Sequence, residues 1–442
     1  MKRDLTKGSE TTSLLLFAAP MILGNLLQQV YNIADTWVVG RFVSSDALAA
    51  VGSAYTLMTF LTSILIGLCM GSGAVFSFYY GKGEKEQMQN RLQTAFVLIG
   101  VFSILLNVVV LVLVKPVLFL MRIPEEITSL MQDYVEIVFC GIFFVFLYNF
   151  FAFLLRSLGN SIAPLFFLGA ASVLNVVLDL IFVICFGWGI KGAATATVIS
   201  QGLSGVGLAG YTWIFEKELR FKKRNMHMEA FAVKEIVRFS VASSLQQSVM
   251  NFGILMIQGL VNTFGASVMA AFAAAVKIDT FAYMPAQEFG NAYSIFISQN
   301  YGAGAKHRIR NGTKEAIQIS VCFCVAISIF VYILARYLMM IFVKAGETEI
   351  IQIGMGYLRI EGVFYLGIGI LFLLYGYYRG INRPEMSLVL TIISLGTRVV
   401  LAYTLAPITG IGVLGIWWAI PVGWLLADVT GIVYMKRFVQ WE

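Results

Sequence analysis

An aspartate stands inside a long apolar segment near the start of the chain and is the first candidate for chemistry. Asp35 shares a helix face with Gln28 and Tyr31, because the three residues follow i, i+3 and i+7 spacing. An ionisable side chain inside a bilayer is costly, and such residues face the protein interior and mark functional sites. Asp35, Tyr31 and Gln28 are therefore predicted to belong to a buried polar site.

A second aspartate, Asp179, lies in another apolar segment together with other polar residues. Asn175 and Asp179 are four residues apart and share a helix face, and Thr197 lies in the following segment. These three residues join Asp35 if the helices that carry them bundle together. The sequence thus predicts one acidic cluster assembled from three helices.

The chemistry of this predicted cluster follows from its two carboxylates. Two such groups in a low-dielectric pocket cannot both ionise cheaply, so the pair is expected to take up H⁺ or to bind a small cation. The ligands of Na⁺ would be Asp35, Asn175, Asp179 and Thr197. Either event changes the local charge by one unit and can bias a two-state bundle. The alternative is a set of hydrogen-bonded structural residues that fix helix register.

Further polar residues stand in apolar segments, mostly in the second half of the chain. They form a candidate solute cavity: Asn32, Gln246, Gln247, Met256, Gln258, Asp279, Tyr283, Glu361 and Tyr365. An equally good interpretation is that these residues only pack the helices together. No cofactor and no metal centre is expected, apart from the possible Na⁺ site.

The composition identifies the elements that must position these residues. The chain has 442 residues, of which 59% are hydrophobic and only 12% charged, against about 25% charged in a soluble chain. Twelve apolar segments are long enough to span a bilayer. They lie near 14–40, 53–80, 92–114, 134–156, 162–186, 192–215, 236–263, 268–300, 315–343, 355–378, 386–407 and 412–435. This pattern excludes a soluble enzyme, a nucleic-acid-binding protein and a disordered chain.

The basic residues predict the orientation in the membrane. Most of the 31 Lys and Arg residues fall in the loops on one side of the predicted segments, and that side is expected to be cytoplasmic. Both termini then lie in the cytoplasm, as an even number of spans requires. No cleavable signal peptide is expected, because the first apolar stretch is long and lacks a small-residue cleavage site. The protein is expected to be a monomer in the inner membrane.

An internal repeat divides the chain at half its length. The stretch from Gly81 to Lys85 resembles the stretch from Gly302 to Lys306, at an offset of 221, which is half of 442. Tyr134 and Arg156 match Tyr357 and Arg379 at an offset of 223. Two six-helix lobes, 1–221 and 222–442, are therefore predicted. Because six is even, the lobes should be related by an axis along the membrane normal.

The two halves do not match at the acidic cluster. The offsets pair Asp35 with Ile257 and Asp179 with Ala402. A purely structural requirement of the fold would be expected in both halves. The cluster of the first half is therefore interpreted as a specialisation for coupling.

Small residues and prolines predict local features of the helices. Gly67 and Gly71, and likewise Gly376 and Gly380, are spaced as in close helix–helix contacts. Pro20 lies about four helical turns before Asp35. A bend at Pro20 that responds to protonation of Asp35 is a possible switch.

Several motifs resemble those of the multidrug and toxic-compound extrusion (MATE) family of the MOP flippase superfamily, and most closely its prokaryotic DinF-like branch. The similar stretches are Tyr31-x3-Asp35, Asp46–Ala50, Leu155–Gly159, Leu174–Asp179, Gly192–Thr197 and Ser298–Gly304. The resemblance covers nearly the whole chain. It implies a V-shaped pair of six-helix lobes, with Asp35 as the main coupling carboxylate.

The resemblance also implies an activity, namely export of cationic and aromatic drugs and toxins in exchange for H⁺ or Na⁺ by alternating access. Gln28, Tyr31, Asn175, Asp179 and Thr197 would form the network around Asp35. Another branch of the family places an acidic cation site in the second lobe, for which Glu361 is the nearest candidate and has no evident partners. We do not carry that site over.

Three other functions are weighed against this prediction. A flippase for lipids or lipid-linked saccharides would need a wide cationic cavity, and the acidic cluster argues against it. A passive channel is disfavoured by the unequal halves. An intramembrane enzyme is disfavoured because no His, Ser or metal constellation lies in the apolar segments.

Overall fold

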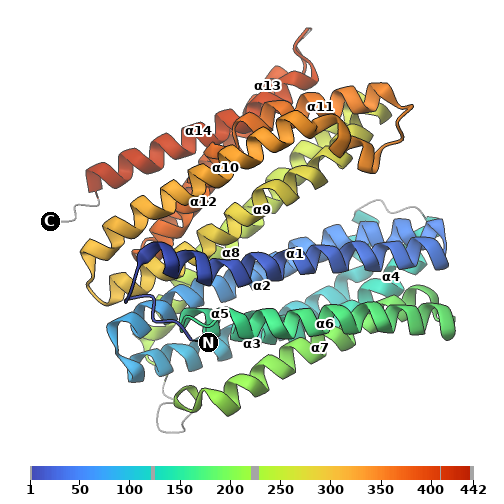
Figure 1. The fold of residues 1–442 in the computed structure, drawn as a ribbon. Coiled ribbons are helices and arrows are strands. Elements are labelled where there is room, and N and C mark those ends of the chain that lie inside the picture. Colours follow the sequence, from blue (N-terminus) through green and yellow to red (C-terminus); the bar gives the residue numbers. More distant parts are fainter. Residues whose placement is uncertain (1, 121–124, 221–227, 409, 439–442) are drawn as a thin grey trace. The chain divides into compact units, whose positions relative to one another are not determined.

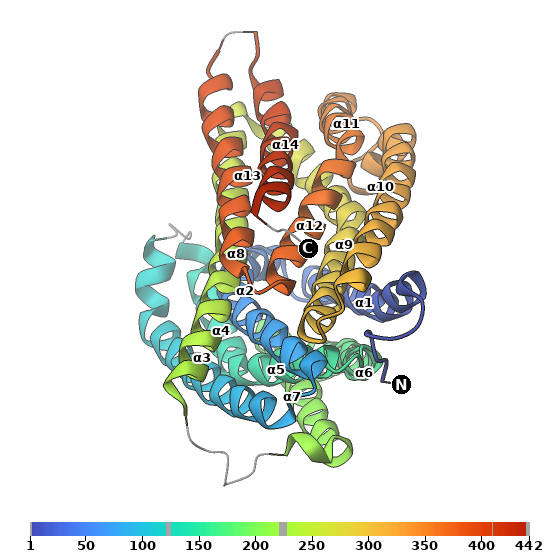
Figure 2. The same cartoon turned by 90° about the vertical axis from the view of Figure 1, so that its left-hand side faces the viewer.

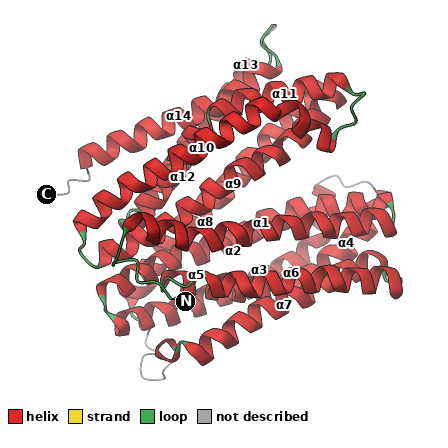
Figure 3. Cartoon of the chain, in the orientation of Figure 1, coloured by secondary structure: helices red, strands yellow, loops and turns green. Residues whose placement is uncertain are grey.

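The computed structural model describes residues 2–120, 125–220, 228–408 and 410–438, and within these ranges the chain is helical, without strands (Figure 3). The α-helices in chain order are α1 (Glu10–Phe42), α2 (Ser45–Lys82), α3 (Lys85–Leu120), α4 (Glu125–Cys140), α5 (Ile142–Ser157), α6 (Ile162–Asp179), α7 (Gly189–Phe215), α8 (Ala230–Val261), α9 (Ala266–Gly302), α10 (Lys306–Phe342), α11 (Thr348–Val363), α12 (Tyr365–Gly380), α13 (Pro384–Leu405) and α14 (Val413–Phe438). Short helical turns occupy Leu180–Cys185 (η1), Lys217–Leu219 (η2) and Asn262–Phe264 (η4).

These helices match the predicted apolar segments. Helices α4 and α5 are the two halves of one rod bent by 45°, and α11 and α12 are the halves of another bent by 52°. When each bent pair is counted as one rod and every other α-helix as one, the described α-helices form twelve rods. Eight single helices are long and apolar enough to cross a membrane, and ten spans result when each bent pair counts as one. The remaining two rods are α7 and α8. Helical geometry is required here because a bilayer core offers no water to hydrogen-bond a free backbone group.

The helix boundaries repeat the offset found in the sequence. Helix α2 begins at Ser45 and α9 at Ala266, 221 residues later. The second helices of the bent pairs begin at Ile142 and Tyr365, which are 223 residues apart. The internal repeat is therefore confirmed at the level of helices, including the bend within each pair.

The turn after the second helix of each half explains one repeated glycine motif. Gly83 follows α2 with a φ of 77°, and Gly304 follows α9 with a φ of 68°. Only glycine adopts this left-handed conformation readily. The motif therefore reverses the chain between neighbouring helices.

The described chain forms two compact units. Unit 1 contains residues 1–4 and 23–244, and unit 2 contains residues 5–22 and 245–442. Helix α1 passes from unit 2 to unit 1 after Ile22, and α8 passes from unit 1 to unit 2 after Ser244. The expected division at 221/222 falls on residues 221–227, which lie outside the described ranges.

Glycines allow close helix contacts inside each unit, as predicted. In unit 1, a Cβ on Gly67 or Gly71 of α2 would overlap the backbone of α8. In unit 2, a Cβ on Gly376 of α12 would overlap the carbonyl oxygen of Gly290 on α9. Helices α9 and α12 accordingly run side by side in both views (Figures 1 and 2).

Some helices carry an apolar surface that the protein itself does not cover. The most apolar window of α10 has a mean hydropathy of 2.5 but is only 17% buried. Ile333 and Ile341 on this helix are 67% and 70% exposed. Such a surface requires an apolar environment, which a bilayer supplies.

Candidate functional site

The two aspartates of the predicted cluster come together inside unit 1. Asp35 lies on α1 and Asp179 is the last residue of α6, and their side chains are close enough to interact directly. The two residues are 7% and 0% exposed. Within the described residues, Oδ1 of Asp35 and both oxygens of Asp179 have no hydrogen-bond donor. The pair therefore holds acceptor oxygens that an added proton or cation can satisfy.

The polar neighbours of Asp179 extend this site. Asn175, one helical turn earlier on α6, donates from Nδ2 to Oγ1 of Thr197 on α7 at 3.4 Å. Both residues are nearly fully buried, and the Oδ1 atom of Asn175 has no donor in the described part of the chain. Directly after Asp179 the helix changes to the π-helical turn η1. Such turns interrupt α-helices frequently at functional sites.

Tyrosines surround the acidic pair. The Tyr31 hydroxyl interacts electrostatically with both aspartates and with Tyr55 on α2. Tyr134 on α4 also interacts with both aspartates and is only 4% exposed. Sequence reasoning used Tyr134 only as a marker of the repeat and missed its place beside the acidic pair. Gln28, by contrast, is exposed on α1.

The donor set of this site consists of oxygen atoms. Carboxylate, amide and hydroxyl oxygens from Asp35, Asp179, Asn175 and Thr197 suit a hard cation, and the carboxylates alone suit a proton. Among the described residues there is no group of three or more His, Cys, Asp or Glu side chains that could hold a metal ion. The geometry therefore fits reversible binding of H⁺ or Na⁺.

Unit 2 contains a second acidic pair that the sequence did not predict. Asp279 on α9 and Glu361 on α11 interact with each other and with Arg398 on α13. They are 5% and 1% exposed, respectively. This finding corrects the view that only the first half has an acidic cluster, although the two pairs occupy non-equivalent positions. The arginine is the main difference, because it offsets one of the two negative charges.

Aromatic packing orients the tyrosine that contacts this second pair. The Tyr357 hydroxyl donates to Oδ2 of Asp279 at 3.4 Å. Its ring packs edge-on against Phe272 and Trp417, with centroids 5.5 Å and 4.9 Å away. Tyr357 matches Tyr134 in the repeat. Each half thus places a tyrosine from the same position beside an acidic pair.

Within unit 2, the residues predicted to line a solute cavity are not all brought together. Asp279, Glu361, Tyr283 and Tyr365 belong to the second acidic cluster, and Asn32 lies in unit 1. Gln258, near the end of α8, donates to Asn262 in the following turn η4 at 2.8 Å. The Met256 carbonyl accepts from Tyr403.

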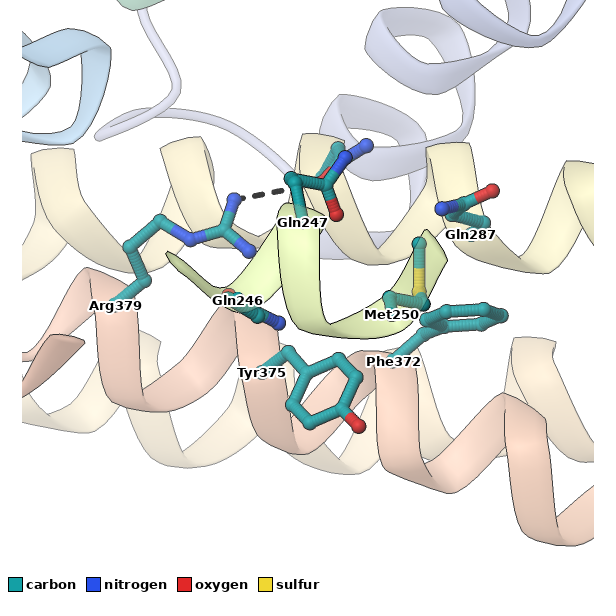
Figure 4. A pocket seen from close by; sticks show the side chains of 8 residues that line it. Gln246, Gln247, Met250, Gln287, Phe372, Tyr375 and Arg379 are labelled. Carbon is teal, nitrogen blue, oxygen red and sulfur yellow. Dashed lines mark hydrogen bonds between the residues drawn. The ribbon is translucent and has the colours of Figure 1, made fainter. Parts of the chain in front are cut away.

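Gln246 and Gln247 do line a pocket, which lies within unit 2 between α8, α9 and α12 (Figure 4). Its other lining residues are Met250, Gln287, Asn291, Phe372, Tyr375 and Arg379. The pocket is partly open, and the space among its lining residues is about 300 Å³ when the open part is included.

Comparison with known proteins connects these features to a family. The MatE family model matches residues 20–181 and 240–404, which include both acidic pairs and most of the described helices. This chain belongs to the MATE family. The resemblance inferred from the motifs is thereby confirmed, and the MATE family consists of transporters rather than enzymes.

Individual relatives cover this MATE chain almost completely. The "probable multidrug resistance protein YpnP" of Bacillus subtilis is 30% identical, over 99% of this chain and 97% of the relative. A "FAD transporter" of Shewanella oneidensis is 24% identical, over 97% of this chain and 94% of the relative. A solved MOP superfamily transporter from Pyrococcus furiosus has a TM-score of 0.91, with 24% identity over 98% of this chain and 96% of that one. The fold is therefore the MATE fold, and this MATE chain is a multi-pass membrane transporter.

Proposed function

We propose that this chain is a secondary antiporter that exports small organic molecules, including cationic and aromatic drugs, in exchange for H⁺ or Na⁺. The observation that carries the proposal is the buried pair Asp35 and Asp179, whose oxygens lack donors within the described residues. A membrane protein keeps such a costly pair when it binds and releases a cation. The names of the relatives, multidrug resistance proteins among them, support export of organic solutes.

The mechanism follows from linkage between the cation and the solute. A cation bound at Asp35 and Asp179 neutralises charge in unit 1 and favours one state of the helices around it. Solute binds better to the other state, so each ligand promotes release of the other. In repeat-built transporters such a change rocks one half against the other around a central site. We assign residues 1–221 to the lobe that couples and residues 222–442 to its partner lobe.

The same proposal covers location and assembly. The protein lies in the inner membrane as a monomer with both termini in the cytoplasm, in keeping with the side on which most Lys and Arg residues fall. We also assign it to the DinF-like branch, whose motifs its own resemble. A flippase function is not favoured, because relatives with up to 30% identity are named as multidrug resistance proteins.

Transport by purified protein in proteoliposomes tests this function. We expect uptake of a fluorescent organic cation when an outward-directed gradient of H⁺ or of Na⁺ is imposed, and no uptake without a gradient. Asp35→Asn and Asp179→Asn should each lower the gradient-driven rate at least about tenfold, because an amide can neither gain nor lose the proton nor neutralise a cation.

The matched control is Asp133→Asn, at a partly exposed residue whose carboxylate pairs with Lys191 at 3.2 Å. It should transport like the unmodified protein. Full coupled transport by Asp35→Asn contradicts the proposed coupling site. Equal transport with and without either gradient contradicts antiport altogether.

A further inference from the structure

The pocket of unit 2 differs in chemistry from the acidic pairs. Arg379 lies at one side of it beside Gln246 and Gln247, while Met250 and Phe372 form an apolar side (Figure 4). The lining thus combines a guanidinium group and amides with an aromatic ring and a thioether. A site of this composition is suited to a ligand that has a negatively charged group and a flat apolar part.

The polar groups of the pocket are buried and have unused hydrogen-bonding capacity. Arg379 is 4% exposed and Gln246 is 2% exposed. Within the described part of the chain, Nε of Arg379 has no acceptor and Oε1 of Gln246 has no donor. The Arg379 Nη1 group donates to Oδ1 of Asn291, but over a long 3.4 Å. Buried polar groups are ordinarily satisfied, so these atoms are available to bind a ligand.

An acidic residue, Glu288, lies near Arg379 and affects its charge. Glu288 attracts the guanidinium electrostatically from α9. Asn291 stands between the two groups, since its Nδ2 donates to Oε1 of Glu288 at 3.2 Å while its Oδ1 accepts from Arg379. A guanidinium has five N–H donors in a fixed fork. Glu288 therefore stabilises the positive charge while donors on Arg379 remain available to a ligand.

The internal repeat allows the residues of this pocket to be compared with the equivalent positions of the first half. Arg379 has an equivalent, Arg156, in the first half. The positions equivalent to Gln287, Asn291 and Tyr375 are occupied by Ile66, Met70 and Ala152. The arginine is thus common to both halves, whereas these three polar positions of the lining have apolar equivalents in the first half. If these residues served only to pack helices, the two halves would not need polar side chains at these positions in one half and apolar side chains in the other.

We propose that this pocket binds the carboxylate or phosphate group of an aromatic solute, with Arg379 holding the charged oxygens and Phe372 contacting the ring. The inference rests on the proposed export function and extends its substrates to aromatic anions. A planar guanidinium matches two oxygens of either group at once.

Binding of matched solute pairs to the purified protein in lipid nanodiscs tests this proposal. Flavin mononucleotide and riboflavin share one fluorescent ring system and differ by a phosphate. Anthracene-2-carboxylate and its primary amide differ by a carboxylate charge. We expect at least about tenfold tighter binding of the charged member in one or both pairs, as a charge-assisted hydrogen bond to a buried arginine provides. The pair that shows the preference identifies phosphate or carboxylate as the recognised group.

Two variants locate the preference at Arg379. Arg379→Gln should abolish it, and Arg379→Lys should retain part of it, because lysine keeps the charge but lacks the planar fork. Arg336→Gln, at an exposed arginine of α10, removes an equal charge elsewhere and should leave the preference unchanged. If Arg379→Gln is not monodisperse in detergent, Arg379→Lys alone decides. A preference for the charged solute that is at least threefold smaller in Arg379→Lys than in the unmodified protein also locates the preference at Arg379.

The proposal is overturned if the unmodified protein binds both members of each pair equally, or if the preference survives in Arg379→Gln. Either result is distinguishable from failure of the proposed function, because gradient-driven transport of an organic cation is measured on the same preparation. A protein that transports the cation but shows no anion preference retains the proposed function and loses this inference.

Discussion

At the scale of single residues, burial without a partner is a property that the proposed functional groups share. Asp35 and Asp179 have acceptor oxygens without donors among the described residues, and Arg379 has a donor without an acceptor. A buried acceptor without a donor, or a buried donor without an acceptor, is costly in a low-dielectric interior. We propose that the three residues belong to two sites of opposite charge, one in each unit.

Tyr134 supports a prediction at this scale. Its hydroxyl is buried beside Asp35 and Asp179, so it can donate to a charged carboxylate and compete with the coupling cation. Tyr134→Phe should change the cation concentration at half-maximal transport about threefold or more while the maximal rate changes little. The measurement is the transport rate in proteoliposomes as a function of H⁺ or Na⁺ concentration.

The repeat provides the control for Tyr134. Tyr357 is its equivalent and donates to Asp279 in the second pair. Tyr357→Phe should leave the cation dependence unchanged if the first pair couples transport. An effect of Tyr357→Phe alone would instead assign coupling to Asp279 and Glu361.

At the scale of elements, close glycine contacts position the pocket. Helices α9 and α12 carry five of its lining residues, and they pack through Gly290, Gly376 and Gly380. A Cβ on Gly290 would lie 2.8 Å from the Phe372 carbonyl oxygen. The separation of these helices therefore sets the distance across the pocket.

Gly376→Ala should destabilise the protein, because the added methyl group overlaps the Gly290 carbonyl and forces the helices apart. We expect a cost of about 1–3 kcal/mol in the free energy of unfolding. Thermal unfolding in detergent, followed by tryptophan fluorescence, measures this effect as a lower midpoint temperature.

The control for this variant is Gly396→Ala on α13, where an added Cβ meets no atom within 4 Å. Alanine favours a helix over glycine by up to about 1 kcal/mol, so the midpoint should stay the same or rise. Equal losses in the two variants would show that the helix contact at Gly376 is not the cause.

At the scale of the whole molecule, two helices connect the compact units. Helix α1 changes unit after Ile22, two residues beyond Pro20, and also carries Asp35. Proline removes one backbone hydrogen bond from a helix and allows a bend. A change at Asp35 can therefore reach the other unit along one continuous helix.

Pro20→Ala should lower the transport rate several-fold while cation and solute binding change little, because the helix becomes stiffer but both sites stay intact. Comparing the transport rate with equilibrium binding on the same preparation separates the two effects. Pro116→Ala is the control, since Pro116 lies inside α3 and α3 lies within unit 1. Parallel losses of rate and affinity in Pro20→Ala would contradict a role in movement.

Much of the fold follows from the sequence, because burial in lipid requires long apolar helices. The apolar segments predicted twelve rods, and the repeat offsets of 221 and 223 recur in the helix boundaries. Asp35, Asp179, Asn175 and Thr197 were also predicted as one cluster from their cost in a bilayer and their helical spacing. These features depend on local composition and period, which a single sequence records.

Only the tertiary structure decided which distant side chains meet. It brought Tyr134 to the first acidic pair, joined Asp279 to Glu361, and placed Arg379 beside Gln246 and Gln247. These contacts depend on how each helix is rotated and where it crosses its neighbours, and small residues such as Gly376 set that geometry. Spacing along one helix cannot specify a rotation relative to another helix, because side-chain packing over the whole interface determines it.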